Sequence, residues 1–236
     1  MEYYYDKSLD SKFVKIDELK WTPWIGKDYL YGASSPKILV IGESHYEWEK
    51  EEDDQEPIEY LKDPNFTRDF INQRGLHFLT GGIENANVLR NLERAIFKRK
   101  NVGDENKLKL WRNSSYYVFI QRALSSRENN DRPNAQDFIK GWEAFDNVVS
   151  ILKPDICLFL GVESSNHYNG LKSKQSLNST FLEIEKYHSK IGSSYPRIGS
   201  LKLANNKNIK LVFIKHPSSY FSWEEWGSFL DDHIKI

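Results

Sequence analysis

Four short runs of nearly continuous apolar residues constrain the fold of this 236-residue chain most strongly. They cover residues 37–42 (KILVIG), 116–120 (YYVFI), 155–161 (DICLFLG) and 210–215 (KLVFIK). A strand with one face in water alternates apolar and polar residues, whereas a strand buried on both faces is apolar along its length. The four runs therefore predict strands of a parallel sheet that is covered on both faces.

Segments with helical periodicity lie between these runs. Residues 84–100 and 135–152 place apolar side chains at spacings of three and four, and Asn134 is a suitable N-cap for the second segment. Further helices are expected after Gly161 and over residues 222–234. Alternating strands and helices predict an α/β fold, a three-layer α/β/α sandwich with a central, mainly parallel four-stranded sheet.

Length and composition predict one domain in a reducing compartment. The length suits a single domain, 1–236, with residues 1–35 as an N-terminal extension packing on it. The single cysteine, Cys157, excludes an internal disulfide. No apolar stretch of membrane-spanning length and no signal-peptide pattern occurs, so we expect a cytoplasmic protein without membrane contact.

Charge is unevenly distributed along the chain. The net charge of −1 neither favours nor excludes nucleic acid, because binding depends on local patches. Residues 47–56 are strongly acidic, and a basic helix end contains Arg90, Arg94, Lys98, Arg99 and Lys100. Such runs are usually solvated surface, although the basic one could contact phosphates.

The loops that follow the apolar runs are the first place to look for a ligand site, because ligands of parallel sheets bind beyond the carboxyl ends of the strands. The last run leads into His216-Pro217-Ser218-Ser219. Pro217 fixes the direction of the loop, and both serines offer groups suited to a phosphate. A simple turn with a capping serine is the alternative interpretation.

The first run leads into Gly42-Glu43-Ser44-His45-Tyr46. Glycine lets a ligand approach the backbone closely, and a carboxylate, a hydroxyl and an imidazole in succession are unusual outside a site. A polar loop with a solvated glutamate is the alternative. No metal-ligand spacing such as His-Glu-x-x-His is present, so we expect neither a metal nor another cofactor.

Together the two loops resemble the signature motifs of the uracil-DNA glycosylase superfamily, a strand ending in Gly-x-x-x-Tyr and a last strand ending in His-Pro-Ser. Between them, residues 74–78 (RGLHF) resemble the segment that supplies the family's base-stacking phenylalanine. Residues 141–161 resemble the helix and core strand that follow. The resemblance covers about residues 36–232, with four features in the family's order.

The resemblance implies hydrolysis of an N-glycosidic bond in DNA after the nucleotide has left the duplex. His216 would stabilise the negative charge that develops on the departing base. Glu43, directly after the glycine as in one branch of the family, would organise the attacking water, with Ser44 or His45 assisting. Tyr46 is similar to the tyrosine that excludes a 5-methyl group.

The resemblance also implies contacts to the base and to the strand around it. Phe78 would stack on the extruded base, and Pro217, Ser218 and Ser219 would hold flanking phosphates. Tyr220 or Phe221 would enter the duplex as a wedge. DNA is therefore the expected partner, bound by a monomer.

The excised base stays open, because the asparagine that reads uracil in the family is missing. Gln121 stands in its place, with the same donor and acceptor but a longer arm. A changed reader indicates a changed base, so uracil in DNA repair and a modified cytosine in phage DNA, as antiviral defence, are both hypotheses.

Two other functions compete with excision. A DNA-binding member that has lost catalysis is one, because Ser44 replaces the family's usual aspartate. A serine hydrolase with Ser44 as nucleophile and His216 as base is the other. Against it, Tyr46 occupies the place of the second glycine in a Gly-x-Ser-x-Gly elbow.

Overall fold

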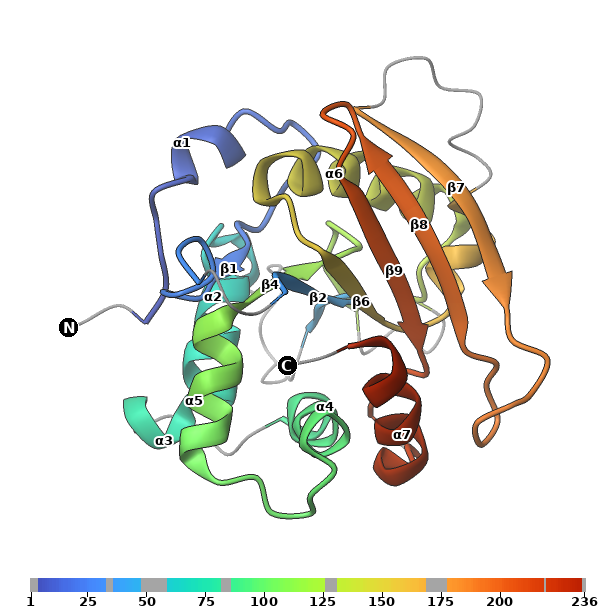
Figure 1. Ribbon diagram of the computed structural model, residues 1–236. Coiled ribbons are helices and arrows are strands. Elements are labelled where there is room, and N and C mark those ends of the chain that lie inside the picture. The colour runs from blue at the N-terminus through green and yellow to red at the C-terminus, as the bar shows by residue number, and fades with distance from the viewer. Residues whose placement is uncertain are drawn as a thin grey trace.

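The protein has a mixed α/β fold around a seven-stranded sheet in the order β1-β4-β2-β6-β9-β8-β7 (Figure 1). The structure, a computed structural model, describes residues 4–32, 36–47, 59–81, 86–125, 131–168, 178–218 and 220–234. The α/β class predicted from the alternation of elements is confirmed. The expected number of four strands is wrong, since three more strands extend the sheet at its edges.

The four apolar runs form the middle of this sheet. They correspond to β2 (Ile38–Gly42), β4 (Ser114–Val118), β6 (Ile156–Leu160) and β9 (Asn208–Ile214). These strands pair in parallel in the order β4-β2-β6-β9. Their carboxyl ends therefore lie at one edge of the sheet, where the two histidine loops begin.

The strands that the sequence did not indicate lie at the two sides of the sheet. β1 (Trp24–Ile25) pairs antiparallel with β4 and has only two residues. β8 (Arg197–Leu203) and β7 (Ser179–Lys186) continue the other side as antiparallel neighbours of β9. β7 mixes exposed and half-buried residues, including Glu and Lys, so it lacks a continuous apolar run. A separate parallel pair joins β3 (Tyr46–Glu47) and β5 (Leu124–Ser125).

Helices cover both faces of the sheet (Figure 1). α6 (Ala135–Leu152) lies on one face and begins as predicted, because Asn134 Oδ1 accepts the N–H groups of Gln136 and Asp137. On the other face lie α4 (Asn87–Phe97), α5 (Asp104–Asn113) and α7 (Trp223–His233). The helix expected after Gly161 is only a 3-10 turn, η3 (Glu163–Asn166).

Shorter helices precede α4 along the chain. They are α1 (Asp10–Phe13), the 3-10 helix η1 (Glu59–Lys62), α2 (Phe66–Phe70), the π-helical turn η2 (Ile71–Gly75) and α3 (His77–Thr80). None of the helices in the described ranges is long and apolar enough to cross a membrane.

Alternate residues of each central strand enter two separate cores. On β6, Cys157 and Phe159 pack in the core that contains Trp142 of α6. Leu158 and Leu160 pack in the other, with side chains of α4, α5 and α7. This two-sided burial explains why the run is apolar throughout.

The N-terminal segment 4–32 lies along the β4 side of the sheet. Trp21 and Trp24 are fully buried, and Trp24 belongs to β1. Arg68 of α2 is also buried; it forms an ion pair with Asp10 and donates from Nε to the Pro23 carbonyl oxygen (3.0 Å). The segment therefore covers the sheet edge.

Candidate functional site

The loops that begin with Glu43 and His216 leave the same edge of the sheet, with the end of β6 between them. β2 and β9 both pair in parallel with β6. Gly161 follows β6, and its N–H donates to the carbonyl oxygen of Ile214 on β9 (3.0 Å). Glu43 lies on the other side of this glycine, since its Oε2 is 2.7 Å from the position that a Cβ on Gly161 would take.

Gly161 makes this arrangement possible. Its φ of 148° is one that L side chains rarely adopt, and a Cβ would collide with the Glu43 carboxylate. Glu43 and Gly161 line a small pocket, the Glu43 pocket, together with Ile41, Gly42, Phe119, Phe159, Leu160 and Ser164. The enclosed part of this pocket has room for about one water molecule. Ligand pockets typically have roughly 300–1,000 Å³, so a substrate would reach only the opening of this one.

The Glu43 carboxyl is electrostatically unusual. Its pKa is raised, first by burial and then by the negative charge of Glu163, whereas the positive charge of Arg132 lowers it. A carboxylate whose pKa moves towards neutrality is a better general base at neutral pH than a solvated glutamate. Neither Glu163 nor Arg132 stands in a motif, so sequence reasoning did not single them out.

The loop that carries Glu163 is held by Arg197 of β8. Its Nη1 donates to the Val162 carbonyl oxygen (2.6 Å) and to Asn166 Oδ1 (2.7 Å), and it also contacts Ser165 Oγ. One guanidinium thus connects three residues in and beside η3 to β8. The wall of the Glu43 pocket on this side is therefore fixed.

His216 is a neutral imidazole at the end of β9. Burial lowers its pKa to about 4, and its Nδ1 lies 3.0 Å from Ser218 Oγ. When the Ser218 hydroxyl donates to Nδ1, the ring proton is on Nε2, which is then a donor. A neutral imidazole with its donor fixed in this way can polarise an oxygen without carrying a charge.

Asn91 of α4 holds the backbone of the same loop. Its Nδ2 donates to the carbonyl oxygens of Pro217 (2.9 Å) and Ser218 (3.3 Å). Nothing in the sequence indicates this contact, because it joins positions 126 and 127 residues apart. Ser219, which was expected to hold a phosphate, lies outside the described residues.

The two aromatic residues that follow have different environments. Tyr220 is 96% exposed, has a φ of 53°, and accepts at its carbonyl oxygen from Lys215 Nζ (2.7 Å). Phe221 is buried and stacks on Trp226 of α7 with ring centroids 6.0 Å apart. Of the two residues considered as a wedge, only Tyr220 is accessible to a partner.

His45 lies away from the Glu43 pocket, in a cage of aromatic rings. It is 6% exposed and contacts the edges or faces of Trp21 (4.9 Å between centroids) and Phe66 (4.6 Å). Its Nε2 is 3.0 Å from Thr67 Oγ1, and burial lowers its pKa to about 3. These contacts suit a structural histidine better than one that assists Glu43.

Gln121, expected to read the base, is engaged with the N-terminal segment. Its Oε1 accepts the N–H groups of Lys20 (2.9 Å) and Trp21 (3.1 Å), and its Nε2 donates to the Val118 carbonyl oxygen. Both the oxygen and the nitrogen of the amide are therefore hydrogen-bonded to backbone groups. A base could use this amide only if these contacts were broken.

Phe78 belongs to α3 and is half-buried against the core that contains α4 and α5. The ammonium of Lys107 on α5 lies 5.6 Å from the centre of its ring. Phe78 does not line the Glu43 pocket. The structure therefore does not bring this residue together with Glu43.

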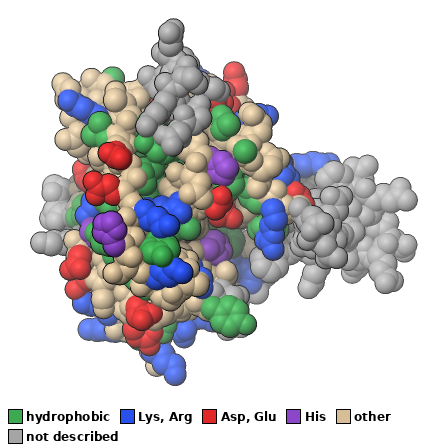
Figure 2. Space-filling view, turned by 90° about the vertical axis from the view of Figure 1, so that its right-hand side faces the viewer, with side chains coloured by type: hydrophobic (Ala, Val, Ile, Leu, Met, Phe, Trp, Pro, Cys, Tyr) green, Lys and Arg blue, Asp and Glu red, His purple; other side chains and the backbone are tan. Residues whose placement is uncertain are grey.

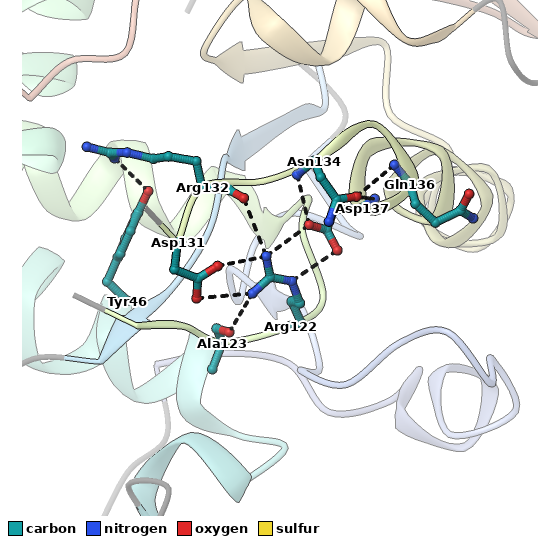
Figure 3. A network of polar contacts seen from close by, with 8 residues as sticks. All are labelled: Tyr46, Arg122, Ala123, Asp131, Arg132, Asn134, Gln136 and Asp137. Atoms are coloured by element: carbon teal, nitrogen blue, oxygen red, sulfur yellow. Dashed lines mark hydrogen bonds and ion pairs between the residues drawn. The ribbon is translucent and has the colours of Figure 1, made fainter. Parts of the chain in front are cut away.

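Tyr46 follows the Glu43 loop and contacts Arg132, as Figure 3 shows. Its hydroxyl oxygen accepts from Arg132 Nη1 (3.0 Å), and the guanidinium carbon lies 5.9 Å from its ring centre. Gly42 at the start of this loop packs against another tyrosine, because a Cβ there would be 2.2 Å from the Tyr116 hydroxyl.

Two groupings that would provide other chemistry are not formed. In the described part of the chain, no hydrogen bond joins Ser44 to His216, and the described partner of His216 Nδ1 is Ser218. Over the same ranges, no three His, Cys, Asp or Glu side chains gather where they could hold a metal ion. Glu43, His45 and His216 therefore do not meet as a metal site.

Charges of both signs are mixed on the face that lies on the β7 and β8 side of the molecule, as Figure 2 shows. The basic helix end at α4 is partly neutralised, since Lys98 forms an ion pair with Asp231 of α7 (2.5 Å). Arg94 Nε donates to the Lys100 carbonyl oxygen (2.8 Å). Neither place is a broad basic surface of the kind that binds nucleic acid without sequence preference.

A scan against models of protein families gave no match to this chain, and a search of curated proteins gave none either. The function must therefore be argued from the loops at the carboxyl edge of the sheet and from their charges.

Proposed function

We propose that this protein is a DNA glycosylase that hydrolyses the N-glycosidic bond of a flipped-out uracil or modified pyrimidine and leaves an abasic site. The observation that carries the proposal is the pair of desolvated groups at one sheet edge. His216, neutral and with its Nδ1 beside Ser218, follows β9, and Glu43 follows β2. β6, which is followed by Gly161, lies between the two strands from which they emerge.

These two groups suit the two halves of the reaction. When the bond between the sugar C1′ and the base nitrogen breaks, its electrons go to the base and the sugar becomes cationic. The Nε2–H of His216 would donate to the base oxygen on which the negative charge gathers. Glu43 would hold a water and take its proton as the water oxygen bonds to C1′. The departed base then takes up one proton, which replaces the proton that Glu43 accepted from the water, so base and enzyme return to their original charges.

Tyr220 supports the DNA-binding part of the proposal. An aromatic side chain that is 96% exposed and lies four residues after His216 is available to fill the space that a flipped nucleotide leaves in the duplex. Ser218 is exposed and suited to a flanking phosphate. Phe221 fixes the end of this loop to α7, because its ring stacks on Trp226.

The contacts of Gln121 give no preference for uracil over a modified pyrimidine. The amide of Gln121 is engaged by backbone at both ends, so it is not preset to read a uracil edge. A modified cytosine in phage DNA remains one version of the hypothesis, with antiviral defence as its role, and uracil in repair is the other.

The proposal is tested by incubating the protein with duplexes that contain uracil, 5-hydroxymethylcytosine or glucosylated 5-hydroxymethylcytosine, followed by alkaline cleavage at abasic sites. We expect cleavage with at least one substrate, abolished by Glu43→Gln and by His216→Ala. Glu185→Gln, the same chemical change at an exposed position of β7, is the matched control. Its activity should equal that of the unmodified protein.

Two outcomes would replace the proposal. Abasic sites in none of the substrates, together with tight duplex binding, would favour the DNA-binding protein without catalysis. Labelling of Ser44 by a fluorophosphonate probe would favour the serine hydrolase, although no hydrogen bond links Ser44 to His216 in the described residues.

A further inference from the structure

A network of charges around Arg122, shown in Figure 3, holds the segment that carries Arg132. The Arg122 guanidinium donates to both carboxylate oxygens of Asp137 on α6, at 3.0 Å each. It also forms an ion pair with Asp131 (2.9 Å). The two carboxylates raise the pKa of Arg122, so its charge is permanent and already neutralised.

This network fixes the backbone on both sides of Arg132. Arg122 Nη2 lies 3.4 Å from the Arg132 carbonyl oxygen, and Asp137 accepts the N–H of Asn134 (2.9 Å). Segment 131–134 is therefore held between the ion pair at Asp131 and the N-terminal cap of α6. A backbone that is already fixed reduces the entropy that segment 131–134 loses when Arg132 binds a ligand.

The Arg132 guanidinium, unlike that of Arg122, keeps donors available. It is exposed, and its described hydrogen bond uses one N–H group on the Tyr46 hydroxyl. Among the described residues it forms no ion pair with a carboxylate, although its charge acts on Glu43 from a distance. Arginine has five N–H donors in a planar fork that matches the oxygens of a phosphate.

The Glu43 pocket is too small to enclose a nucleotide. Its enclosed part has room for about one water molecule, so the base, sugar and phosphate of a nucleotide would all lie at its opening. The exposed Arg132 lies close enough to influence Glu43. Its positive charge would also offset repulsion between the Glu43 carboxylate and a phosphate beside it.

We propose that Arg132, held by the Arg122–Asp131–Asp137 network and hydrogen-bonded to Tyr46, binds a backbone phosphate next to the nucleotide whose glycosidic bond faces Glu43. This inference rests on the proposed glycosylase function and assigns the residue that positions its substrate strand. Tyr46 connects Arg132 to the Glu43 loop, because its hydroxyl oxygen accepts from Arg132 and it lies three residues after Glu43 in the chain.

The test is binding of a fluorescent duplex that carries a tetrahydrofuran abasic-site analogue, measured by anisotropy at several salt concentrations. The analogue mimics the product and needs no knowledge of the excised base. Arg132→Gln should weaken binding roughly tenfold and reduce the slope of log affinity against log salt by about 1, as expected for one lost phosphate contact. Arg132→Lys should restore the slope but only part of the affinity, because it lacks the fork.

Lys140→Gln is the matched control, since it removes one exposed positive charge from the second turn of α6. Its affinity and salt slope should equal those of the unmodified protein. Thermal unfolding of each variant verifies that the fold is kept. Deoxycytidine monophosphate as competitor distinguishes a free nucleotide from a DNA strand as the ligand, and we expect no competition at concentrations that saturate the duplex.

Unchanged affinity and salt slope in Arg132→Gln would overturn the inference, as would an equal loss in Lys140→Gln. Competition by the free nucleotide would also overturn it, because the phosphate would then not belong to a strand. Failure of the glycosylase proposal looks different. In that case no substrate is cleaved, while binding of the duplex still depends on Arg132.

Discussion

His45 and His216 occupy similar places in the sequence and different environments in the fold. Each follows a buried parallel strand of the central sheet, and burial lowers the pKa of each imidazole, to about 3 and about 4 respectively. His45 is enclosed by Trp21 and Phe66 and hydrogen-bonded to Thr67. His216 is only half-buried and contacts the exposed Ser218.

A lowered pKa alone therefore does not distinguish a reactive histidine from a structural one. Both rings are neutral at pH 7, but His216 is only half-buried, contacts the exposed Ser218 and precedes the exposed Tyr220 by four residues. Aromatic rings that enclose an imidazole, as at His45, exclude a ligand from it. An imidazole that is only half-buried in a surface loop, as at His216, can still donate to a ligand.

The largest effect on the rate of excision is expected from His216→Ala. Loss of a preorganised donor should reduce single-turnover excision by about 10²- to 10³-fold, because the developing negative charge on the base loses its partner. The measurement is product formation with the best substrate from the panel. His188→Ala, at an exposed position after β7, should leave the rate unchanged. A rate for His216→Ala within threefold of the unmodified protein would contradict the role.

His45→Gln tests whether His45 is a buried, structural residue. An unfolded histidine binds a proton near pH 6.5 and the folded one only near pH 3, so between these values the unfolded state holds more protons. The free energy of unfolding therefore falls as the pH is lowered, by up to about 1.4 kcal/mol per pH unit for this one group. Glutamine does not titrate, so urea unfolding between pH 4 and 6.5 should show a shallower pH dependence.

The same slope in His45→Gln and in the unmodified protein would show that His45 is not buried as a neutral ring. A loss of excision at pH 7 as large as that of His216→Ala, in a fully folded His45→Gln, would show that the two histidines act together.

Tyr220→Asn tests the accessible surface beside His216 with a smaller expected effect. Asparagine tolerates the left-handed backbone that Tyr220 adopts, so stability should stay the same or rise slightly. Excision from a duplex should fall roughly tenfold, because the stacking contribution of the ring to a flipped state is worth about 1–3 kcal/mol. Single-stranded substrates need no wedge and should be cleaved as before. An equal loss on both substrates would argue against insertion into the duplex.

Glu163→Gln should give the smallest change, a shift in pH dependence. The negative charge of Glu163 helps to raise the pKa of Glu43, so its removal lowers that pKa. Glu43 must be deprotonated to act as a base, and the acid limb of the excision profile should therefore move to lower pH. The rate at the plateau should stay close to that of the unmodified protein. A shift towards higher pH would contradict the assignment of Glu43 as the base.

Much of the fold was predictable because its causes are local. Burial on both faces makes a strand apolar throughout, and this revealed the four central strands. The cap at Asn134 marked the start of α6. β7 was missed because one of its sides faces solvent, and β1 because a two-residue strand has no periodicity.

The candidate site was predictable only in outline. Parallel strands end at one edge, so Glu43 and His216 were expected there. Gln121 carried the right chemistry for a base reader, but the backbone of Lys20 and Trp21 occupies its amide. Arg132 was not recognised, because its importance comes from Tyr46 and the Arg122 network and not from a motif.

By itself, the sequence determined the α/β class, the buried central strands and the polar loops at their ends, since each depends on residues close together in the chain. Only the tertiary structure decided that His45 is caged while His216 stays accessible, and that Tyr220 projects while Phe221 is buried. Desolvation is the physical reason. The pKa and the accessibility of a side chain depend on what packs around it, and those neighbours come from helices and strands far away in the sequence.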